Sequence, residues 1–351
     1  MVTEDEAMGR AITLAARGLG TTSPNPVVGC LLLDPDGEVV GEGFHAYAGG
    51  PHAEIVALAQ AGERARGGTA VVTLEPCNHT GRTGPCVKAL IGAGIRRVVI
   101  GVDDPNPAAA GGAAALRDAG IDVVVGARRS EAEAGNVAWL TAVRRGRPYV
   151  TWKFAATLDG RAAAADGTSQ WITSSPARTD VHALRSTVDA IVVGVGTVLA
   201  DDPQLTVRDL RDGSLAITQP LRVVVDTAGR TPATARVRDA SAPTWIATAA
   251  ELGTGPDGRA DLSALLTTLY GRGVRSVLLE GGPTLAGAFL AAGLVDKVIG
   301  YVAPKLLGAG LPALVDAGVV TIAEAIDLDL IDVAQVGDDL RFTATLRQKE
   351  A

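Results

Sequence analysis

The chain has 351 residues, of which 47% are hydrophobic and 20% are charged, so it contains enough apolar side chains to build globular cores. This length exceeds what one core normally uses, and we expect two domains. The formal net charge of -7 does not favour binding to nucleic-acid phosphates. No apolar run approaches the roughly 18–20 residues that span a bilayer, and the acidic first residues do not resemble a signal peptide. We therefore expect a cytoplasmic protein.

Three cysteines in a chain of this length do not make a disulfide framework. Cys30 lies in the apolar run of residues 27–33 and is expected to be a buried strand thiol. Cys77 and Cys86 therefore remain as the cysteines that a functional site would use.

The first part of the chain alternates between strand and helix patterns, which indicates a sheet with helices packed on it. A proline on each side holds Asn25 in a rigid, extended loop. His52 and Glu54 lie in the first turn of an expected helix and converge only at its start. The expected helices are residues 6–17, 52–61, 86–92, 112–119 and 130–145, and the expected strands are residues 27–33, 38–44, 69–74, 96–102 and 121–125.

The expected helix 130–145 closes the first domain, and Ser130 and Glu133 have the spacing of a capping box at its start. The charged stretch Arg144-Arg145-Gly146-Arg147-Pro148 predicts a boundary, which gives domains 1–146 and 147–351. The second domain repeats the alternation, with expected strands at 149–156, 190–193, 221–226, 244–247, 276–279, 297–301 and 340–346 and expected helices at 176–186, 261–271 and 283–291.

Three side chains of the first domain have the composition of an open catalytic zinc site. His52 offers an imidazole and Cys77 and Cys86 offer thiolates, which leaves the fourth position of a tetrahedral zinc for water. Glu54 is placed to carry protons from that water to a leaving amine. His-x-Glu followed by Pro-Cys and a second cysteine is typical of zinc deaminases that act on amino-pyrimidines and amino-purines. Here eight residues separate the two cysteines, where the general motif has two.

The same ligands also fit a closed structural zinc site, in which His79 would be the fourth ligand. This alternative leaves Glu54 and Asn25 without a role. We interpret His79 as a substrate-loop residue, and His45 as a structural residue or one near the rim of the active site.

Residues 23–29, 51–54 and 73–86 resemble the deaminase half of the bifunctional deaminase–reductase family of riboflavin biosynthesis. The long segment between the cysteines, residues 78–85, matches that family and not the nucleoside or tRNA deaminases. The resemblance implies one zinc ion per chain, with the ligands His52, Cys77 and Cys86. It implies that Glu54 is the proton donor, and that the substrate is contacted by Asn25, His79 and Arg82. Arg82 is the expected phosphate partner, because guanidinium binds phosphate bidentately.

Residues 153–161, 167–174, 194–208 and 280–285 continue the resemblance, in order, with the NADPH-dependent reductase domain of that family. The resemblance implies an α/β protein, with a cytidine-deaminase-like three-layer domain followed by a dihydrofolate-reductase-like α/β domain. In agreement, no Gly-x-Gly-x-x-Gly follows a strand. Residues 280–284 predict a strand end, a glycine turn and a helix start, whose N–H groups can bind the phosphate of a cofactor.

The resemblance also implies contacts in the second domain. The expected NADPH contacts are Ala155, Trp171, Thr197, Asp201, Thr227, Gly282, Pro283, Thr284, Leu285, Ala286, Gly287 and Ala288. The expected substrate contacts are Lys153, Ser169, Arg185, Leu205, Arg208 and Glu280. Arg185 and Arg208 fit a clamp for the sugar phosphate, and the alternative for both is pairing at the surface.

The function that the resemblance implies is a zinc-dependent hydrolytic deamination of 2,5-diamino-6-(5-phosphoribosylamino)pyrimidin-4-one. An NADPH-dependent reduction of the ribosyl group then gives 5-amino-6-(5-phosphoribitylamino)uracil. We expect this small-molecule substrate and a homodimer or higher homo-oligomer, and neither nucleic acid nor membrane as a partner.

Two alternative functions lead to different expectations. A nucleoside or RNA-editing deaminase with an appended domain would act on cytidine, adenosine or tRNA without oxidising NADPH. A regulatory or RNA-binding protein on an inactive deaminase scaffold would lack a ligand or the proton carrier, and none is missing here.

Overall fold

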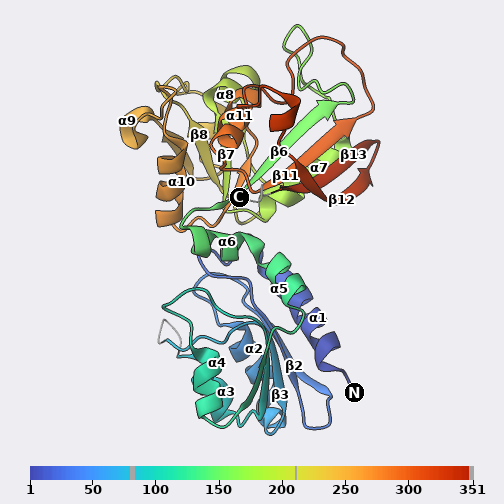
Figure 1. Cartoon of the computed structure of the whole chain (residues 1–351), viewed down its shortest axis with the longest axis vertical. Helices are drawn as coiled ribbons and strands as arrows, with labels where there is room; N and C mark the ends of the chain where they lie inside the picture. Colours follow the sequence, from blue (N-terminus) through green and yellow to red (C-terminus); the bar gives the residue numbers. More distant parts are fainter. Residues whose placement is uncertain (80–83, 210–211, 348–351) are drawn as a thin grey trace. The chain divides into compact units, whose positions relative to one another are not determined.

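The computed structural model describes residues 1–79, 84–209 and 212–347 (Figure 1). It divides the chain into two compact units, Met1–Gly146 and Arg147–Ala351. Among the residues that are described, no helix combines the length and the apolar character that crossing a membrane requires.

The first unit is built on a five-stranded sheet in the order β2-β1-β3-β4-β5. Strand β1 is antiparallel to both of its neighbours, and β3, β4 and β5 run parallel. The strands are β1 (Gly29–Leu33), β2 (Val39–Phe44), β3 (Thr69–Leu74), β4 (Arg97–Val102) and β5 (Asp122–Val125). The helices are α1 (Glu4–Ala15), α2 (Ala53–Ala61), α3 (Cys86–Gly92), α4 (Gly112–Asp118), α5 (Arg129–Gly135) and α6 (Val137–Arg145), with short 3-10 turns η1 (Ala16–Gly18) and η2 (Gly62–Ala65).

Helices cover both faces of this sheet, which gives the three layers that the sequence predicted. Alternating strand residues explain the two cores, because side chains at successive positions point to opposite faces. Cys30 and Leu32 face the core formed with α2, α3 and α4. Leu31 and Leu33 face the core formed with α1. Cys30 is fully buried in β1, as expected.

Two of these helices lie directly against the main chain of the sheet. A β-carbon added at Gly43 of β2 would lie 2.2 Å from the carbonyl oxygen of Ala53, and one at Gly41 would lie 2.3 Å from that of Ala57. A β-carbon at Gly29 of β1 would lie 2.0 Å from the carbonyl oxygen of Ala11 in α1. Only glycine permits this approach, so these glycines set the distance between helix and strand.

The prediction of a single closing helix at 130–145 is wrong in one respect, because the structure has two helices there. Asn136 leaves the helical conformation (φ -123°, ψ 18°) and separates α5 from α6. Its Oδ1 accepts a hydrogen bond from the backbone N–H of Val27 (3.3 Å), and Trp139 Nε1 donates to the carbonyl of Pro24 (3.0 Å). The break therefore helps to hold the loop that contains Asn25.

The expected capping box at the start of this helix is also wrong. Helix α5 follows Arg128, which has a left-handed conformation (φ 46°), and no side chain caps it. Arg128 instead pairs with the carboxylates of Asp5 and Glu131.

The second unit is built on an eight-stranded sheet in the order β12-β13-β11-β6-β10-β7-β8-β9. The six strands from β11 to β9 in this order are parallel, whereas β13 and β12 pair antiparallel at one edge. The strands are β6 (Tyr149–Thr157), β7 (Ala190–Gly194), β8 (Leu221–Val225), β9 (Thr244–Ala247), β10 (Ser276–Leu279), β11 (Lys297–Ala303), β12 (Leu328–Val336) and β13 (Asp339–Leu346).

The helices of the second unit also lie on both faces of its sheet. Helices α10 and α11 share the largest core, while α8 and α7 cover the opposite side chains of the strands. The helices are α7 (Ser175–Ser186), α8 (Val195–Asp201), α9 (Ala249–Leu252), α10 (Leu262–Gly271) and α11 (Pro283–Ala291), with 3-10 turns η3 (Arg236–Arg238) and η4 (Ile322–Glu324). The sequence did not predict β12, α8 or α9; β12 is mostly exposed and its register shifts between Leu330 and Asp332.

Buried arginines fasten two segments of this unit. Arg147, its first residue, makes a bidentate pair with Asp296 at 2.7 and 2.8 Å, and the Asp296 carboxylate also accepts the N–H of Val150. Arg222 of β8 is fully buried and donates to the Asp239 carboxylate and to the carbonyl of Gln204. These bonds tie loops to the sheet near its ends.

Gly43→Ala should lower the free energy of unfolding of the first unit by about 1–3 kcal/mol, because the added methyl group overpacks the contact with α2. Urea unfolding followed by the fluorescence of Trp139, the one tryptophan of residues 1–146, measures this. Gly92→Ala is the matched control, since a β-carbon there meets no atom within 4 Å. Equal losses in the two variants would contradict the role given to Gly43.

Candidate functional site

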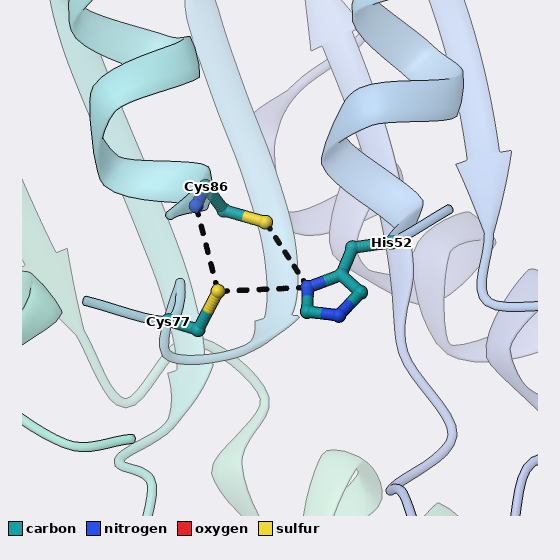
Figure 2. A group of neighbouring side chains, drawn as sticks. All are labelled: His52, Cys77 and Cys86. Carbon is teal, nitrogen blue, oxygen red and sulfur yellow. Dashed lines mark hydrogen bonds between the residues drawn. The ribbon is translucent and has the colours of Figure 1, made fainter. Parts of the chain in front are cut away.

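The three expected zinc ligands meet at the ends of three elements. His52 is the residue before α2, Cys77 follows β3, and Cys86 is the first residue of α3. Their ligand atoms all lie within 4.8 Å of one another. His52 Nδ1 lies 3.3 Å from the sulfur of Cys86 and 3.5 Å from that of Cys77, and Figure 2 shows the imidazole edge turned towards both sulfurs.

The electrostatics of this group favour an ionised sulfur. The pKa of Cys77 is lowered by its hydrogen bond with the Cys86 thiol and by the bond with His52. The backbone N–H of Cys86 adds a bond to the same sulfur (3.4 Å). The pKa of His52 is raised, first by its bond to Cys77. One imidazole and two sulfurs that share protons in this way fit a zinc ion, which replaces those protons when it binds.

Glu54 lies in the first turn of α2 and is 3% exposed. Burial raises the pKa of its carboxyl group, and the thiol of Cys86 interacts with it. The structure therefore brings an acid that can hold a proton next to the ligand set, which is the position that a proton carrier needs.

His45 joins the Asn25 loop to the ligand loop. Its Nδ1 lies 3.0 Å from the carbonyl of Pro51, and its Nε2 lies 3.1 Å from the amide nitrogen of Asn25. Because a carbonyl only accepts, Nδ1 carries the proton and Nε2 accepts from Asn25. His45 is 3% exposed, and its ring lies edge-on to that of His52 at 5.5 Å. Its place is structural, between Asn25 and the residue before the first ligand.

The remaining expected residues of this site lie in the segment between the cysteines. His79 is exposed and is not part of the ligand group, so the structure does not form the closed site with His79 as fourth ligand. Arg82 lies outside the described residues.

Four of the six expected substrate residues of the second unit form a largely buried charged cluster: Lys153, Arg185, Arg208 and Glu280. Arg185 of α7 and Glu280, the residue after β10, make a bidentate pair with both distances at 2.7 Å, and their side chains are 13% and 10% exposed. The alternative of surface pairing is therefore wrong for Arg185. Lys153 of β6 interacts with both charges, and burial lowers its pKa. Arg208 is near enough to Arg185 for that cation to lower its pKa, after burial.

Other expected residues of the reductase unit occupy the loops after its strands. The hydroxyl of Ser169 donates to Asp201 at 3.3 Å. Trp171 is 62% exposed, and the guanidinium of Arg178 lies 4.3 Å from its ring centre. Leu205 is 3% exposed and has a positive φ of 54°.

Thr227 and Ala155, two further expected cofactor residues, also have partners within the unit. The Thr227 hydroxyl accepts from the N–H of Ala260 (3.2 Å). Ala155 packs with α7 residues in the core beneath β11. The preceding Asp226 is buried and binds the N–H and hydroxyl of Thr231, which is a structural role.

Two glycine turns form a cradle that fits the phosphates of NADPH. Helix α11 begins after Gly282 with a proline in its first turn, and α8 begins after Gly194. The turns face each other, since a β-carbon at Gly282 would lie 3.5 Å from the hydroxyl oxygen of Thr197. A β-carbon at Gly196 would meet no atom within 4 Å. Backbone N–H groups at such turns bind phosphate without interference from side chains.

Known protein families match both units. Residues 1–102 match the cytidine and deoxycytidylate deaminase zinc-binding region, and residues 148–342 match the RibD C-terminal domain. The riboflavin biosynthesis protein RibD of Mycobacterium tuberculosis H37Rv is 48% identical over 344 residues, which cover 98% of this chain and 97% of that protein. RibD of Escherichia coli K12 is 46% identical over 355 residues, which cover 95% and 96%.

The chain belongs to the RibD family. Solved RibD structures have the same fold over almost the whole length: that of Acinetobacter baumannii RibD (form 1) gives a TM-score of 0.88 at 41% identity and covers 98% of this chain and 99% of that one. The diaminohydroxyphosphoribosylaminopyrimidine deaminase/5-amino-6-(5-phosphoribosylamino)uracil reductase of Thermotoga maritima gives 0.89 at 37% identity, with 98% and 99% covered.

As a RibD protein, the chain is a bifunctional enzyme of riboflavin biosynthesis, with a zinc-binding deaminase domain and a reductase domain that uses NADPH. The cytidine-deaminase-like domain and the α/β reductase domain confirm the predicted fold class. The match of residues 148–342 to the RibD C-terminal domain contradicts a nucleoside or RNA-editing deaminase with an unrelated appended domain.

Sequence reasoning missed Glu75, which positions a ligand of the zinc site. Its two carboxylate oxygens accept the backbone N–H groups of Asp104 (3.0 Å) and Ala113 (2.8 Å). A β-carbon at Gly112 would lie 1.9 Å from the carbonyl oxygen of Pro76, so α4 also touches the chain directly before Cys77. The only available signal was a carboxylate beside Pro-Cys, which spacing alone does not interpret.

His182 was missed as well. It lies three residues before Arg185 in α7, on the same face of the helix, and its Nδ1 accepts the backbone N–H of Arg208 at 3.2 Å. That helical spacing was the signal that could have found it.

Glu280→Gln should lower the free energy of unfolding of the second unit by about 3–5 kcal/mol, because it leaves the Arg185 charge buried without a partner. The Arg185 charge opposes burial and lowers the pKa of Glu280 below its ordinary 4.5, so this contribution is present above pH 4.5 and is lost as pH falls through the lowered pKa. Urea unfolding between pH 7 and pH 3 measures it. The exposed pair of Arg347 and Asp329 is the control, and Asp329→Asn should cost less than about 1 kcal/mol. A flat pH dependence of the difference between wild type and Glu280→Gln would contradict the assignment.

Proposed function

We propose that residues 1–146 form the domain that deaminates 2,5-diamino-6-(5-phosphoribosylamino)pyrimidin-4-one, and that residues 147–351 form the domain that reduces the product. The names of the two reactions are those that the Thermotoga maritima protein carries. The observation that supports the first reaction most directly is the convergence of three soft ligands beside one buried carboxyl group.

In the deaminase reaction, His52, Cys77 and Cys86 hold the zinc ion. Zinc, when bound, supplies the Lewis acidity that makes water nucleophilic near neutral pH. Glu54 accepts a proton as the oxygen of water bonds to the carbon that bears the amino group, and it gives a proton to the nitrogen as the C–N bond breaks. Ammonia leaves and a carbonyl oxygen takes its place. Asn25, which His45 holds, and the loop with His79 and Arg82 contact the substrate.

In the reductase reaction, the glycine turns at 194–197 and 281–284 would hold the phosphates of NADPH, and the exposed ring of Trp171 would contact the cofactor. NADPH supplies the hydride when bound. Opening of the ribosyl ring breaks the bond between C1 and the ring oxygen and moves the N–H proton to that oxygen, which leaves a C1=N bond. A hydride at C1 and a solvent proton at the nitrogen would then give the ribityl chain. Lys153 lies beside the ribose, and Ser169, Leu205 and Glu280 complete the substrate contacts.

An excess of positive charge supports binding of the substrate phosphate in this unit. In the part of the chain that the structure describes, Lys153 and Arg208 both interact with Arg185, and Glu280 is the carboxylate that interacts with Lys153 and Arg185. A phosphate monoester would balance that charge. Arg208 is the group that best fits it, because Nε and Nη2 of Arg185 are held by Glu280 and Nη1 donates to the carbonyl of Thr206.

We also propose a cytoplasmic homodimer formed through the β12 edge of the reductase unit, with no nucleic-acid partner. Edge strands with exposed apolar side chains favour pairing with another strand. Leu328, Leu330, Ile331 and Val333 of β12 are between 43% and 62% exposed. A second copy of this chain is the occupant that fits, since two identical edges can pair about a two-fold axis.

Glu54→Gln should abolish ammonia release, because glutamine does not carry the proton, while NADPH oxidation with the deaminated substrate stays within twofold of wild type. Removal of zinc with a chelator should have the same effect on both activities, and added zinc should restore ammonia release to the wild-type enzyme alone. Ammonia and NADPH are measured on the same sample. Loss of NADPH oxidation in the variant, or ammonia release without zinc, would contradict the proposal.

Leu330→Lys should convert the dimer to a monomer, because it places a charge in the proposed apolar contact. Light scattering after gel filtration gives the mass of each variant. Asp329→Lys tests the neighbouring position, whose side chain pairs with Arg347 in the same chain, and should leave the dimer intact. A wild-type monomer, or a dimer that Leu330→Lys does not affect, would contradict this surface.

A further inference from the structure

His182 is a histidine of the reductase unit to which the proposed reaction gives no role. It is partly buried on α7, and its ring faces the loop that leads to Arg208. The charged groups that act on it are Arg185 from the same helix, Arg208 from that loop and Glu280 from the end of β10. The carbonyl of Thr206 also interacts with the ring.

The hydrogen bond to Arg208 determines the protonation state of this ring. A backbone N–H only donates, so Nδ1 of His182 accepts with its lone pair and carries no proton. The imidazole is therefore neutral. A protonated ring would turn an N–H towards another N–H and would place a third cation beside Arg185 and Arg208. Burial and these two cations lower the pKa of His182 to about 4, which agrees with that state.

The loop before Arg208 has strained main-chain positions. Hydrogen bonds such as the one to His182 therefore stabilise its conformation. Asp202 and Leu205 have positive φ values of 39° and 54°, which side chains disfavour. Other bonds hold the loop at intermediate points: the carbonyl of Thr206 accepts from Arg185 (3.1 Å), and the N–H of Val207 donates to Gln219 (2.8 Å). Beyond Arg208, the N–H of Asp209 donates to the carbonyl of Ser214 (3.0 Å), and the bond to His182 is the one that ties the main chain of Arg208 itself to α7.

The guanidinium of Arg208 has no anionic partner among the described residues. Across residues 1–79, 84–209 and 212–347 its Nε is buried without a hydrogen-bond partner, and no carboxylate pairs with its guanidinium. The direction of that group depends on the main chain at Arg208, which His182 holds.

We propose that His182, as a neutral imidazole, is a positioning residue of the reductase: it fixes the main chain of Arg208 so that the guanidinium meets the phosphate monoester of the substrate. This inference rests on the proposed function, in which Arg208 contacts the substrate.

The test compares reductase kinetics of two His182 variants with the deaminated substrate, 5-amino-6-(5-phosphoribosylamino)uracil. His182→Leu removes the acceptor and should raise KM about tenfold with kcat within twofold, since one hydrogen bond contributes about that factor. In His182→Asn the side-chain oxygen takes the place of Nδ1, and KM should stay within about threefold of wild type. Ser186→Ala, at an exposed position of the same helix, is the control. If the leucine variant does not fold, His182→Ala replaces it with the same expectation.

Three further measurements separate this role from a merely structural one. In an Arg208→Ala background, His182→Leu should raise KM no further. With the dephosphorylated substrate, the leucine variant and wild type should have the same KM. The ratio of KM between wild type and His182→Asn should stay constant from pH 8 to pH 5.5, because a neutral ring does not titrate in that range.

The outcomes separate the role of His182 from the proposed contact of Arg208 with the substrate. If Arg208→Ala raises KM and His182→Leu does not, or if asparagine is as poor as leucine, the role of His182 is overturned. A KM ratio that rises below pH 6.5 also overturns it, because the ring would then be an ordinary, titrating histidine. If Arg208→Ala leaves KM unchanged, the proposed contact of Arg208 with the substrate is wrong, and the role of His182 that rests on it is overturned as well.

Discussion

Helix α2 touches strand β2 through main-chain atoms, and the zinc site depends on that contact. Gly41 and Gly43 leave no side chain between strand and helix, so the helix has one possible distance from the sheet. His52 precedes this helix and Glu54 lies in its first turn, so the same contact places both the imidazole and the carboxyl group. The sulfurs come from the end of β3 and the start of α3. A ligand set drawn from separate elements binds a metal only when their spacing is fixed within a few tenths of an ångström.

In the second unit, buried arginine side chains fix the positions of the loops around the candidate site. Arg185 is held between Glu280 and the carbonyl of Thr206, and Arg222 holds the carbonyl of Gln204. Both arginines thus act on the loop that runs from α8 to Arg208. Residues of both candidate sites lie where parallel strands end, as in other α/β sheets. Cys77 follows β3 in the first unit, and Glu280 follows β10 in the second.

The convergence of His52, Cys77 and Cys86 could be predicted from the sequence because zinc chemistry restricts both residue type and order. Most strands and helices could also be predicted, since their apolar patterns are local. The break at Asn136 could not, because its cause is a bond to Val27, which is 109 positions away. His182 and Glu75 accept the backbone N–H groups of Arg208 and Asp104, which carry no residue-specific signal, so only the helical spacing of His182 from Arg185 pointed to the site. Strand β12 has few buried side chains and therefore no clear alternation.

The bidentate pair of Arg147 with Asp296 bears on how the reductase unit could be produced alone. Arg147 directly follows the last residue of the first unit, yet its guanidinium belongs to the second, beside the N–H of Val150. The side chain of Asp296 is 5% exposed, so a fragment that starts at Pro148 would lose two charge-assisted bonds at a buried carboxylate. A truncated reductase therefore has to retain an arginine that belongs, by position in the chain, to the linker.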